Sequence, residues 1–400
     1  MSRRPQLHFT PERGWLNDPH GITWWGGRYH LFHQNVPDQT TWGPHCHWAH
    51  VSSPDLVGDW VDEGIALAPG EGDDGVWTGS LVLDPAGEAH ILYTSIETST
   101  MNMGVIRFAR PLDSSWRQWT KGDIVIRPPE GLGLTSFRDP FVQREGEGWV
   151  MHVGAGSDTG VAMALRYRSD DLTSWRFEGS TLGRSTHERD PVWMGSLWEC
   201  PQVIDIDGYT VMVSSIFDEG ELHYAGAAVG TMVDGRLAVE TWQRISHGDS
   251  YYAPSFFRDS ESRPCLMFWM RGFGGEEAGW ASALSVPHLL SVKNRRLHLE
   301  PHPHLTERLA AMGDGSTADI HYMSVPRWAP DQGTLFERRD SAGAPIAVVR
   351  ATDAELVLDR PDTQSQSIPY RGGEITLLVD GDVLEIWTGG EILGASLESD

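Results

Sequence analysis

Short apolar runs recur along the chain at a nearly constant interval. They begin at Tyr29, Ala89, Trp149, Tyr209 and Cys265, with spacings of 60, 60, 60 and 56 residues. Each run follows a turn that contains glycine or proline, and a second strand-like run comes after it. Short runs with this punctuation are typical of β-strands, and none of them has helical periodicity.

A second repeat supports the first. Segments that begin at Ser53 and Ser169 share Ser, Asp-Leu, Trp and Glu-Gly, and they lie 116 residues apart, close to two periods. Five units of about 60 residues, each with several short strands, predict a five-bladed β-propeller, because radial repetition buries each blade against its neighbours. The alternatives are a β-sandwich and a helical solenoid, and a solenoid requires a helical periodicity that these runs lack.

The period ends near Pro303, which predicts two domains, residues 1–303 and residues 304–400. Residues 304–315 are predicted to be a connector. Strand candidates follow at 346–351, 354–359, 375–380 and 383–387, and turns separate them. We expect an all-β protein with a small C-terminal β-sandwich-like domain, short for a full two-sheet sandwich.

Three acidic residues lie in phase with the repeat. Asp18, Asp139 and Glu199 each precede an apolar run by 10 or 11 residues, and a proline follows each within two positions. A single Asp-Pro commonly starts a turn. Three acids in phase predict instead that their carboxyls converge around the central axis.

Clustered carboxylates suit glycoside hydrolysis, in which one carboxylate attacks while another, kept protonated, donates a proton to the leaving oxygen. Glu199, between Trp198 and Cys200, has the apolar sequence setting that favours an acid. Arg138, beside Asp139, is expected to keep that aspartate ionised.

Charge and cysteine content limit which partners, disulfides and metal sites can be expected. The chain has 31 basic and 56 acidic residues, a net charge of −25, which argues against nucleic acid and anionic membrane as partners. Its three cysteines form neither a disulfide framework nor a zinc spacing. His45, Cys46, His47 and His50 could suggest a metal, but packing roles are favoured. No metal or cofactor is predicted.

The start of the sequence bears on the expected location of the protein. The first residues contain two arginines without an apolar stretch behind them, so a signal peptide is not predicted. We therefore expect a cytoplasmic protein, although a secreted protein with its signal removed has the same appearance. No apolar run approaches the length of a membrane span. The sequence leaves the oligomeric state open.

Several motifs, in order, resemble the signature blocks of glycoside hydrolase family 32, the family of invertases, inulinases and levanases. They are GWLNDPHG (14–21), HLFHQNVP (30–37), WGPHCHWAH (42–50), FRDP (137–140), WECP (198–201) and YYAP (251–254). The resemblance implies a retaining hydrolase of terminal β-fructofuranosyl bonds in sucrose, fructooligosaccharides or fructans, acting on a small carbohydrate.

The resemblance also implies individual roles. Asp18 would be the nucleophile, Glu199 the general acid and then the base, and Asp139 a stabiliser of the transition state. Retention implies that the carboxyls of Asp18 and Glu199 lie roughly 5–5.5 Å apart. The residues that would line the fructose pocket are Asn17, Gln34, Trp42, Ser80 and Arg138.

Four positions depart from the family pattern. His20 replaces an asparagine, Gln202 an acid, Ser250 an aspartate and His288 an arginine, which puts the preferred substrate in doubt. Three alternatives remain: a fructosyltransferase on the same scaffold, a five-bladed pentofuranosidase of arabinan or xylan type, and a non-catalytic propeller that binds sugar or protein.

Overall fold

The computed structural model describes residues 3–312, 319–361 and 363–398. Its regular structure is nearly all β, as the sequence predicts. Among the described residues there is one α-helix, α1 (Pro303–Met312), besides the short 3₁₀ turns η1 (Thr98–Thr100) and η3 (Pro330–Gln332). Within this part of the chain, no helix has the length and apolar character needed to cross a membrane.

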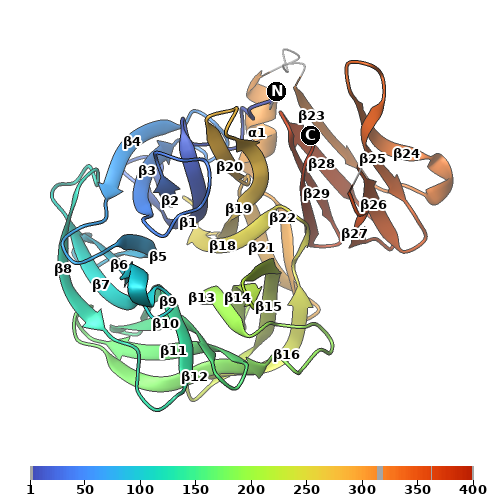
Figure 1. Ribbon diagram of the computed structural model, residues 1–400. Coiled ribbons are helices and arrows are strands. Elements are labelled where there is room, and N and C mark those ends of the chain that lie inside the picture. Colours follow the sequence, from blue (N-terminus) through green and yellow to red (C-terminus); the bar gives the residue numbers. More distant parts are fainter. Residues whose placement is uncertain (1–2, 313–318, 362, 399–400) are drawn as a thin grey trace.

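Most strands between residues 14 and 301 form antiparallel units arranged around a common centre (Figure 1). The first contains β1 (Gly14–Trp25), β2 (Arg28–Val36), β3 (His47–Ser53) and β4 (Val61–Leu67). The second contains β5 (Gly75–Leu83), β6 (Ala89–Ile96), β7 (Val105–Pro111) and β8 (Trp119–Ile126). The third contains β9 (Leu134–Glu145), β10 (Gly148–Ser157), β11 (Val161–Ser169) and β12 (Arg176–Ser185).

Two further units complete this part. The fourth contains β13 (Leu197–Ile206), β14 (Tyr209–Asp218), β15 (Glu221–Val233) and β16 (Arg236–Arg244). We call the strands β18 (Tyr251–Arg258), β19 (Pro264–Gly275), β20 (Trp280–Leu284), β21 (His288–Lys293) and β22 (Arg296–Pro301) the fifth unit, although they belong to one nine-stranded sheet with the strands of the first. Parallel pairing of Gly14 and Trp15 with Trp280 and Ala281 joins the first unit to the fifth.

The apolar runs found in the sequence are the second strands of these units, not the first. They correspond to β2, β6, β10, β14 and β19. Each is nearly all buried because it packs between neighbouring units, which gives a continuous hydrophobic signal. The acids lie within the strands before them, closest to the centre, whereas the sequence placed them just ahead of a first strand.

The C-terminal part contains two sheets that pack face to face. One has the order β17-β30-β29-β28-β23 and the other β24-β25-β26-β27. Their strands are β23 (Ile320–Val325), β24 (Thr334–Arg339), β25 (Pro345–Ala351), β26 (Glu355–Asp359), β27 (Gln366–Pro369), β28 (Ile375–Asp380), β29 (Val383–Thr388) and β30 (Glu391–Ser396). Buried residues of both sheets form one hydrophobic cluster.

This part was expected to be too short for two sheets, and that expectation was wrong. The first sheet gains an edge strand, β17 (Ser246–Gly248), from the chain between the fourth and fifth units. The expected connector is mostly helix α1, and its residues 313–315 lie outside the described residues.

A buried polar group joins the N-terminal segment, the fifth unit and the C-terminal strands. His8 lies 2.8 Å from Asp380 Oδ2 through Nδ1 and 3.0 Å from Glu385 Oε2 through Nε2. The Tyr251 hydroxyl donates to Glu385 Oε1 at 2.7 Å, and the His8, Asp380 and Glu385 side chains are fully buried. We call these four residues the His8 cluster.

Candidate active site

The innermost strands share a β-bulge where they reach the centre. Pairing is interrupted at Asp18 in β1, Thr78 in β5, Asp139-Pro140 in β9, Cys200-Pro201 in β13 and Ala253-Pro254 in β18. Asp139, Cys200 and Ala253 have positive φ values of 64°, 50° and 46°. A bulge of this kind redirects side chains, and here it aims them at the axis.

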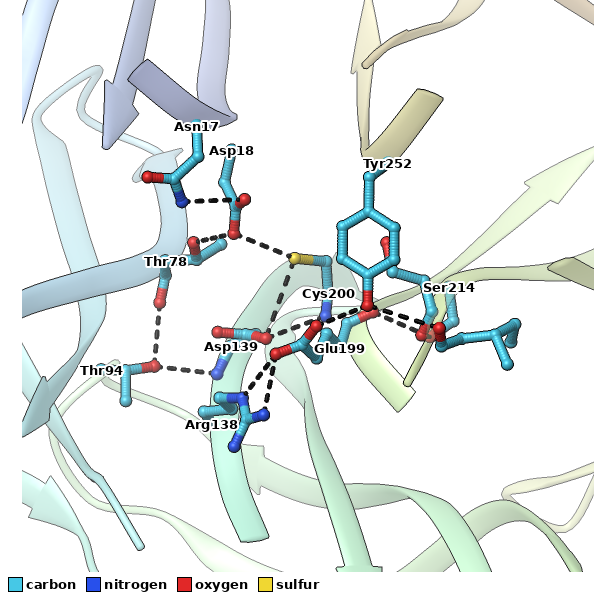
Figure 2. A network of polar contacts seen from close by, with 12 residues as sticks. Asn17, Asp18, Thr78, Thr94, Arg138, Asp139, Glu199, Cys200, Ser214 and Tyr252 are labelled. Carbon is cyan, nitrogen blue, oxygen red and sulfur yellow. Dashed lines mark hydrogen bonds and ion pairs between the residues drawn. The ribbon is translucent and has the colours of Figure 1, made fainter. Parts of the chain in front are cut away.

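The three acids converge on one cavity of about 870 Å³. Asp18, Asp139 and Glu199 all line it (Figure 2). Cys200 lies between the two aspartates, its Sγ 3.6 Å from Asp18 Oδ2 and 3.8 Å from Asp139 Oδ2. The structure therefore brings together three side chains that are 121 and 60 residues apart in the sequence. The 5–5.5 Å separation of the Asp18 and Glu199 carboxyls stays a prediction.

Hydroxyl and amide donors surround Asp18. Thr78 Oγ1 donates to Oδ2 at 2.6 Å, Asn17 Nδ2 donates to Oδ1 at 3.0 Å, and Gln34 Nε2 lies 3.4 Å from Oδ2. Burial raises the pKa of Asp18, the hydrogen bonds from Thr78 and Asn17 oppose this rise, and the charge of Glu199 adds to it. The donors favour the ionised form that a nucleophile requires.

Glu199 has polar neighbours, contrary to the apolar setting expected from its sequence context. Arg138 donates to Oε1 through Nε at 3.0 Å and Nη2 at 2.8 Å, and the Tyr252 hydroxyl donates to Oε2 at 2.6 Å. The apolar neighbours Trp198 and Cys200 alternate with Glu199 along β13, so they do not enclose its carboxyl. Both oxygens of Glu199 are thereby held in a fixed orientation.

Asp139 is the acid whose protonation differs most from the sequence expectation. Burial raises its pKa to about 8; Arg138 opposes this rise, and the charges of Glu199 and Asp18 add to it. Arg138 was expected to keep Asp139 ionised, but its hydrogen bonds go to Glu199 instead. Near neutral pH the unliganded cavity therefore retains a proton that an exposed aspartate would have lost.

The predicted pocket residues divide into two groups. Asn17, Gln34, Trp42 and Arg138 line the cavity, and Trp42 is 45% exposed at its rim. Ser80 does not line it, because its hydroxyl donates to Pro140 O and accepts from Val142 N on the neighbouring strand. Ser80 was expected in the pocket from the resemblance alone, and the bulge in β5, which the sequence does not reveal, lies at Thr78 instead.

Residues that the sequence missed also belong to the site. Trp269 and Arg271 line the cavity, as does Tyr252, which had been noted only as part of a motif. Thr78 does not line the cavity but donates to Asp18 from behind it. Thr78 reaches Asp18 because the next residue, Gly79, lies against β6, where a Cβ would overlap Leu92 O. That glycine was the one available signal for Thr78.

Four polar atoms of the cavity wall are buried and have no hydrogen-bond partner within the described ranges. They are Gln34 Oε1, Arg138 Nη1, Trp269 Nε1 and Arg271 Nε. Unpaired buried polar atoms are costly, and several in one cavity indicate a ligand that supplies the missing partners. One acceptor and three donors suit a polyhydroxylated ligand.

A family model of the glycosyl hydrolases family 32 N-terminal domain matches residues 8–303. The chain belongs to glycoside hydrolase family 32. A sucrose-6-phosphate hydrolase from Escherichia coli is 32% identical over 316 residues, which is 74% of this chain and 64% of that protein. A sucrose:sucrose 1-fructosyltransferase from Festuca arundinacea is 28% identical over 380 residues, 86% of this chain and 56% of that protein.

Solved structures of the family have the same fold. A Bombyx mori β-fructofuranosidase matches with a TM-score of 0.82 at 23% identity, over 99% of this chain and 89% of that one. The curated relatives are longer: this chain spans 64% and 61% of the sucrose-6-phosphate hydrolases from E. coli and Zymomonas mobilis.

Three departures from the family pattern have structural roles. Gln202 donates to Pro254 O at 3.1 Å and accepts from Phe256 N at 2.6 Å, so its amide links β13 to β18 as both donor and acceptor. The His20 ring packs on Trp48 at 3.8 Å between ring centroids. His288 accepts a hydrogen bond from Trp387 Nε1 at 2.8 Å. The Ser250 hydroxyl is buried without a partner among the described residues, and nothing in the structure explains it.

Proposed function

We propose that this family 32 member hydrolyses terminal β-fructofuranosyl bonds with retention of configuration. The observation that carries the proposal is a pair of carboxylates in one cavity with separate supports. Thr78 and Asn17 hold Asp18, whereas Arg138 and Tyr252 hold Glu199. Independent supports suit a reaction in which the two carboxyls perform different tasks.

In the first step, an Asp18 oxygen attacks the anomeric carbon of the fructosyl group. Glu199 gives its proton to the glycosidic oxygen, the bond from that carbon to oxygen breaks, and the leaving sugar departs as an alcohol. In the second step, Glu199 takes a proton from water. The oxygen of that water attacks the anomeric carbon, which releases fructose and regenerates the Asp18 carboxylate.

Asp139 would bind fructose hydroxyls during both steps. With its pKa raised to about 8, its carboxyl donates as well as accepts a hydrogen bond near neutral pH. Such a group can bind a neutral polyol without adding a negative charge next to the carboxylate of Asp18. The unpaired Gln34 Oε1 and Arg138 Nη1 supply further partners for hydroxyls.

The proposed fold of the catalytic domain explains how the three acids come together. Five units around one centre suggest a five-bladed β-propeller, with residues 1–303 as the catalytic domain and 304–400 as a C-terminal β-domain. The innermost strand of each blade would then contribute one bulge to the axis, and Asp18, Asp139 and Glu199 come from three of these bulges.

Two questions of substrate remain within this proposal. The relatives' names include both hydrolases and a fructosyltransferase, and transfer requires only that a sugar replaces water in the second step. The leaving sugar could be neutral, or it could carry the phosphate that the name sucrose-6-phosphate hydrolase implies.

Incubation with sucrose and with sucrose 6-phosphate tests the proposal through the free fructose and the free glucose or glucose 6-phosphate released. Equal amounts of the two products indicate hydrolysis, and a deficit of fructose indicates transfer. Activity on neither these disaccharides nor a fructooligosaccharide would contradict the proposal. Activity on arabinan or xylan with inversion would favour a pentofuranosidase, whose carboxyls lie roughly 6.5–9.5 Å apart.

The acid role of Glu199 has its own test. Glu199→Gln should lower kcat roughly 10²- to 10⁴-fold on sucrose and much less on a fructoside with an acidic phenol as leaving group. An equal loss on both substrates would remove Glu199 from the acid role.

A further inference from the structure

We propose that Tyr251 is a positioning residue for the reaction, and that through it the C-terminal sheet fixes the orientation of Glu199. Tyr251 acts through its chain neighbour Tyr252, whose hydroxyl binds the Glu199 carboxyl. The inference rests on the proposed function, because it takes Glu199 as the acid that protonates the leaving sugar.

Two consecutive tyrosines of β18 bind carboxylates on opposite sides of the strand. Tyr252 lines the cavity, and its hydroxyl donates to Glu199 Oε2 at 2.6 Å (Figure 2). Tyr251 is buried outside the cavity lining, and its hydroxyl donates to Glu385 Oε1 in β29 at 2.7 Å. Successive side chains of a strand alternate in direction, so one short piece of backbone carries both contacts.

The chain that leads to Tyr252 is attached to the C-terminal sheet. Strand β17 pairs in parallel with β30, and Ser250 N then donates to Gly394 O at 3.3 Å. The Tyr251 ring lies so close to the same glycine that a Cβ at Gly394 would come within 2.6 Å of ring atom Cε2. Residues 246–251 are therefore held by β29 and β30 up to the residue before Tyr252.

The backbone after Tyr252 is held less regularly. Tyr251 and Tyr252 pair in register with Met270 and Trp269 of β19, and the register shifts immediately after them. Ala253, the next residue, has a positive φ of 46°. Because a bulge interrupts the ladder of hydrogen bonds, the placement of Tyr252 depends mainly on the residues before it.

The Tyr251 hydroxyl is the polar part of this attachment. Burial and the charge of Glu385 raise the pKa of Tyr251 well above its ordinary value, so the hydroxyl stays a donor throughout the pH range of an assay. Glu385 Oε2 pairs with His8 at 3.0 Å, and His288 Nε2 lies 3.7 Å from Oε1, beyond hydrogen-bond distance. Tyr251 is thus the hydrogen-bond donor that this buried oxygen has within the described part of the chain.

Glu199 needs a fixed orientation because it must first give a proton to the leaving sugar and then take one from water. Arg138 holds Oε1 with two hydrogen bonds, and Tyr252 holds Oε2 with one. If the β18 backbone moved, the carboxyl would turn about its contacts with Arg138, and its proton would no longer face the leaving oxygen. A misplacement of about 1 Å in such a contact can cost on the order of 10²-fold in rate.

The test compares kcat on two fructosides in the wild type, in Tyr251→Phe and in Glu199→Gln. One is the disaccharide that the enzyme cleaves, and the other carries an acidic phenol, which leaves with little help from an acid. Tyr251→Phe removes the hydroxyl and keeps the ring, which packs on Phe268 at 5.1 Å between ring centroids. Its kcat should fall roughly 5- to 20-fold on the disaccharide and under about twofold on the phenol fructoside.

A conservative variant tests whether the acceptor in β29 is what matters. Glu385→Gln keeps a carbonyl oxygen for the Tyr251 hydroxyl and should retain most of the wild-type ratio of the two kcat values. Glu385→Leu removes the acceptor and should lower the ratio as Tyr251→Phe does. If Glu385→Leu does not fold, Tyr251→Phe and Glu385→Gln still decide the question.

Two control variants should lose stability without touching this link. Asp380→Asn changes a carboxylate of the His8 cluster that accepts from His8 and not from Tyr251. Tyr370→Phe removes another buried tyrosine hydroxyl of the C-terminal part, one that donates to Gly373 O at 3.2 Å. Both variants should have a lower Tm and the wild-type ratio of kcat values.

Three results would overturn the inference alone. An unchanged ratio in Tyr251→Phe would make Tyr251 a structural residue only. An equal loss on both fructosides, or a fall of the ratio in Asp380→Asn as large as that in Tyr251→Phe, would mean that the variants loosen the fold in general. The proposed function is judged separately by Glu199→Gln: if this variant left the ratio unchanged, Glu199 would not be the acid, and the proposed mechanism and the inference would both fail.

Discussion

The cavity and the His8 cluster both bury carboxylates, but they differ in how the polar atoms are paired. In the His8 cluster, Asp380 accepts from His8 Nδ1 and from the backbone N–H groups of Gln6, Leu7 and His8, and Glu385 uses both oxygens. In the cavity, four polar atoms of the wall remain without a partner in the described part of the chain.

The pKa shifts of the two regions run in opposite directions. In the cavity, burial raises the pKa of Asp18 and Asp139. In the His8 cluster, burial would raise the pKa of Asp380, but the hydrogen bond and charge of His8 outweigh it and lower that pKa. Burial of a carboxylate therefore does not identify a reactive site by itself. The cavity differs in two ways: several of its buried polar atoms have no hydrogen-bond partner in the described part of the chain, and its Asp139 keeps a proton near neutral pH.

The largest expected effect comes from the same change made in both regions. Asp18→Asn should lower sucrose or sucrose 6-phosphate turnover by on the order of 10⁴-fold, because the nucleophile is lost. Its thermal stability should stay equal or increase, since one buried charge is removed near Glu199 and Asp139. Asp380→Asn should do the reverse, with lower stability and nearly normal kcat in the folded fraction.

Turnover and melting temperature are measured for both variants. If both variants lost activity, or both lost stability, the contrast between the cavity and the His8 cluster would be wrong. Residual activity above about 1% in Asp18→Asn would remove Asp18 from the nucleophile role.

The next largest effect is the loss of the cation from the His8 cluster. His8→Leu leaves Asp380 and Glu385 buried without it, which should cost about 3–5 kcal/mol of unfolding free energy. His90→Leu is the control, because the buried His90 pairs at 3.1 Å with a single carboxylate, that of Asp84, which keeps 24% of its side chain exposed, and the loss should be about 1 kcal/mol. Denaturant unfolding measures both. Equal losses would mean that the cluster is no stronger than a pair with one solvated partner.

A smaller effect should appear as a pH dependence of stability. Burial lowers the pKa of His8, but the charges and hydrogen bonds of Glu385 and Asp380 outweigh it and raise the pKa to about 9. A raised histidine pKa stabilises the fold fully below about pH 6.5, the unfolded value, and this stabilisation is lost as pH rises to about 9. The total loss should be about 3 kcal/mol.

Asp139 titrates in an overlapping window, since its raised pKa removes stability between about pH 4 and pH 8. The stability difference between the wild type and His8→Leu isolates the histidine. This difference should shrink between pH 6.5 and pH 9; a constant difference would show that His8 is not protonated in the fold.

How much the sequence could predict follows from the same structural features. The buried second strands gave a 60-residue period, and so the repeat and the convergence of Asp18, Asp139 and Glu199 could be predicted. The innermost strands could not be read in the same way, because bulges and polar residues such as those of GWLNDPHG interrupt their alternation. The hydrogen bonds of Arg138 could not be predicted, because they go to Glu199, 61 residues further along the chain, although its charge still lowers the pKa of its neighbour Asp139.

The smallest expected effect tests the one pocket residue that the bulge displaced from its predicted place. Thr78 donates to Asp18 Oδ2 at 2.6 Å, whereas Ser80, two residues along β5, binds only the backbone of β9. Thr78→Val keeps the shape and removes the donor that opposes the raised pKa of Asp18. The acid limb of the pH profile of kcat/KM should therefore move to higher pH, with roughly a tenfold loss at the optimum.

Ser80→Ala should lower stability by about 1–3 kcal/mol, because Val142 N loses its acceptor, and leave the profile in place. If Ser80→Ala shifted the acid limb and Thr78→Val did not, the serine would belong to the site after all. In that case β5 would not contain one residue that acts on the Asp18 carboxylate and another that only satisfies buried backbone groups, and the contrast between cavity and scaffold would be wrong.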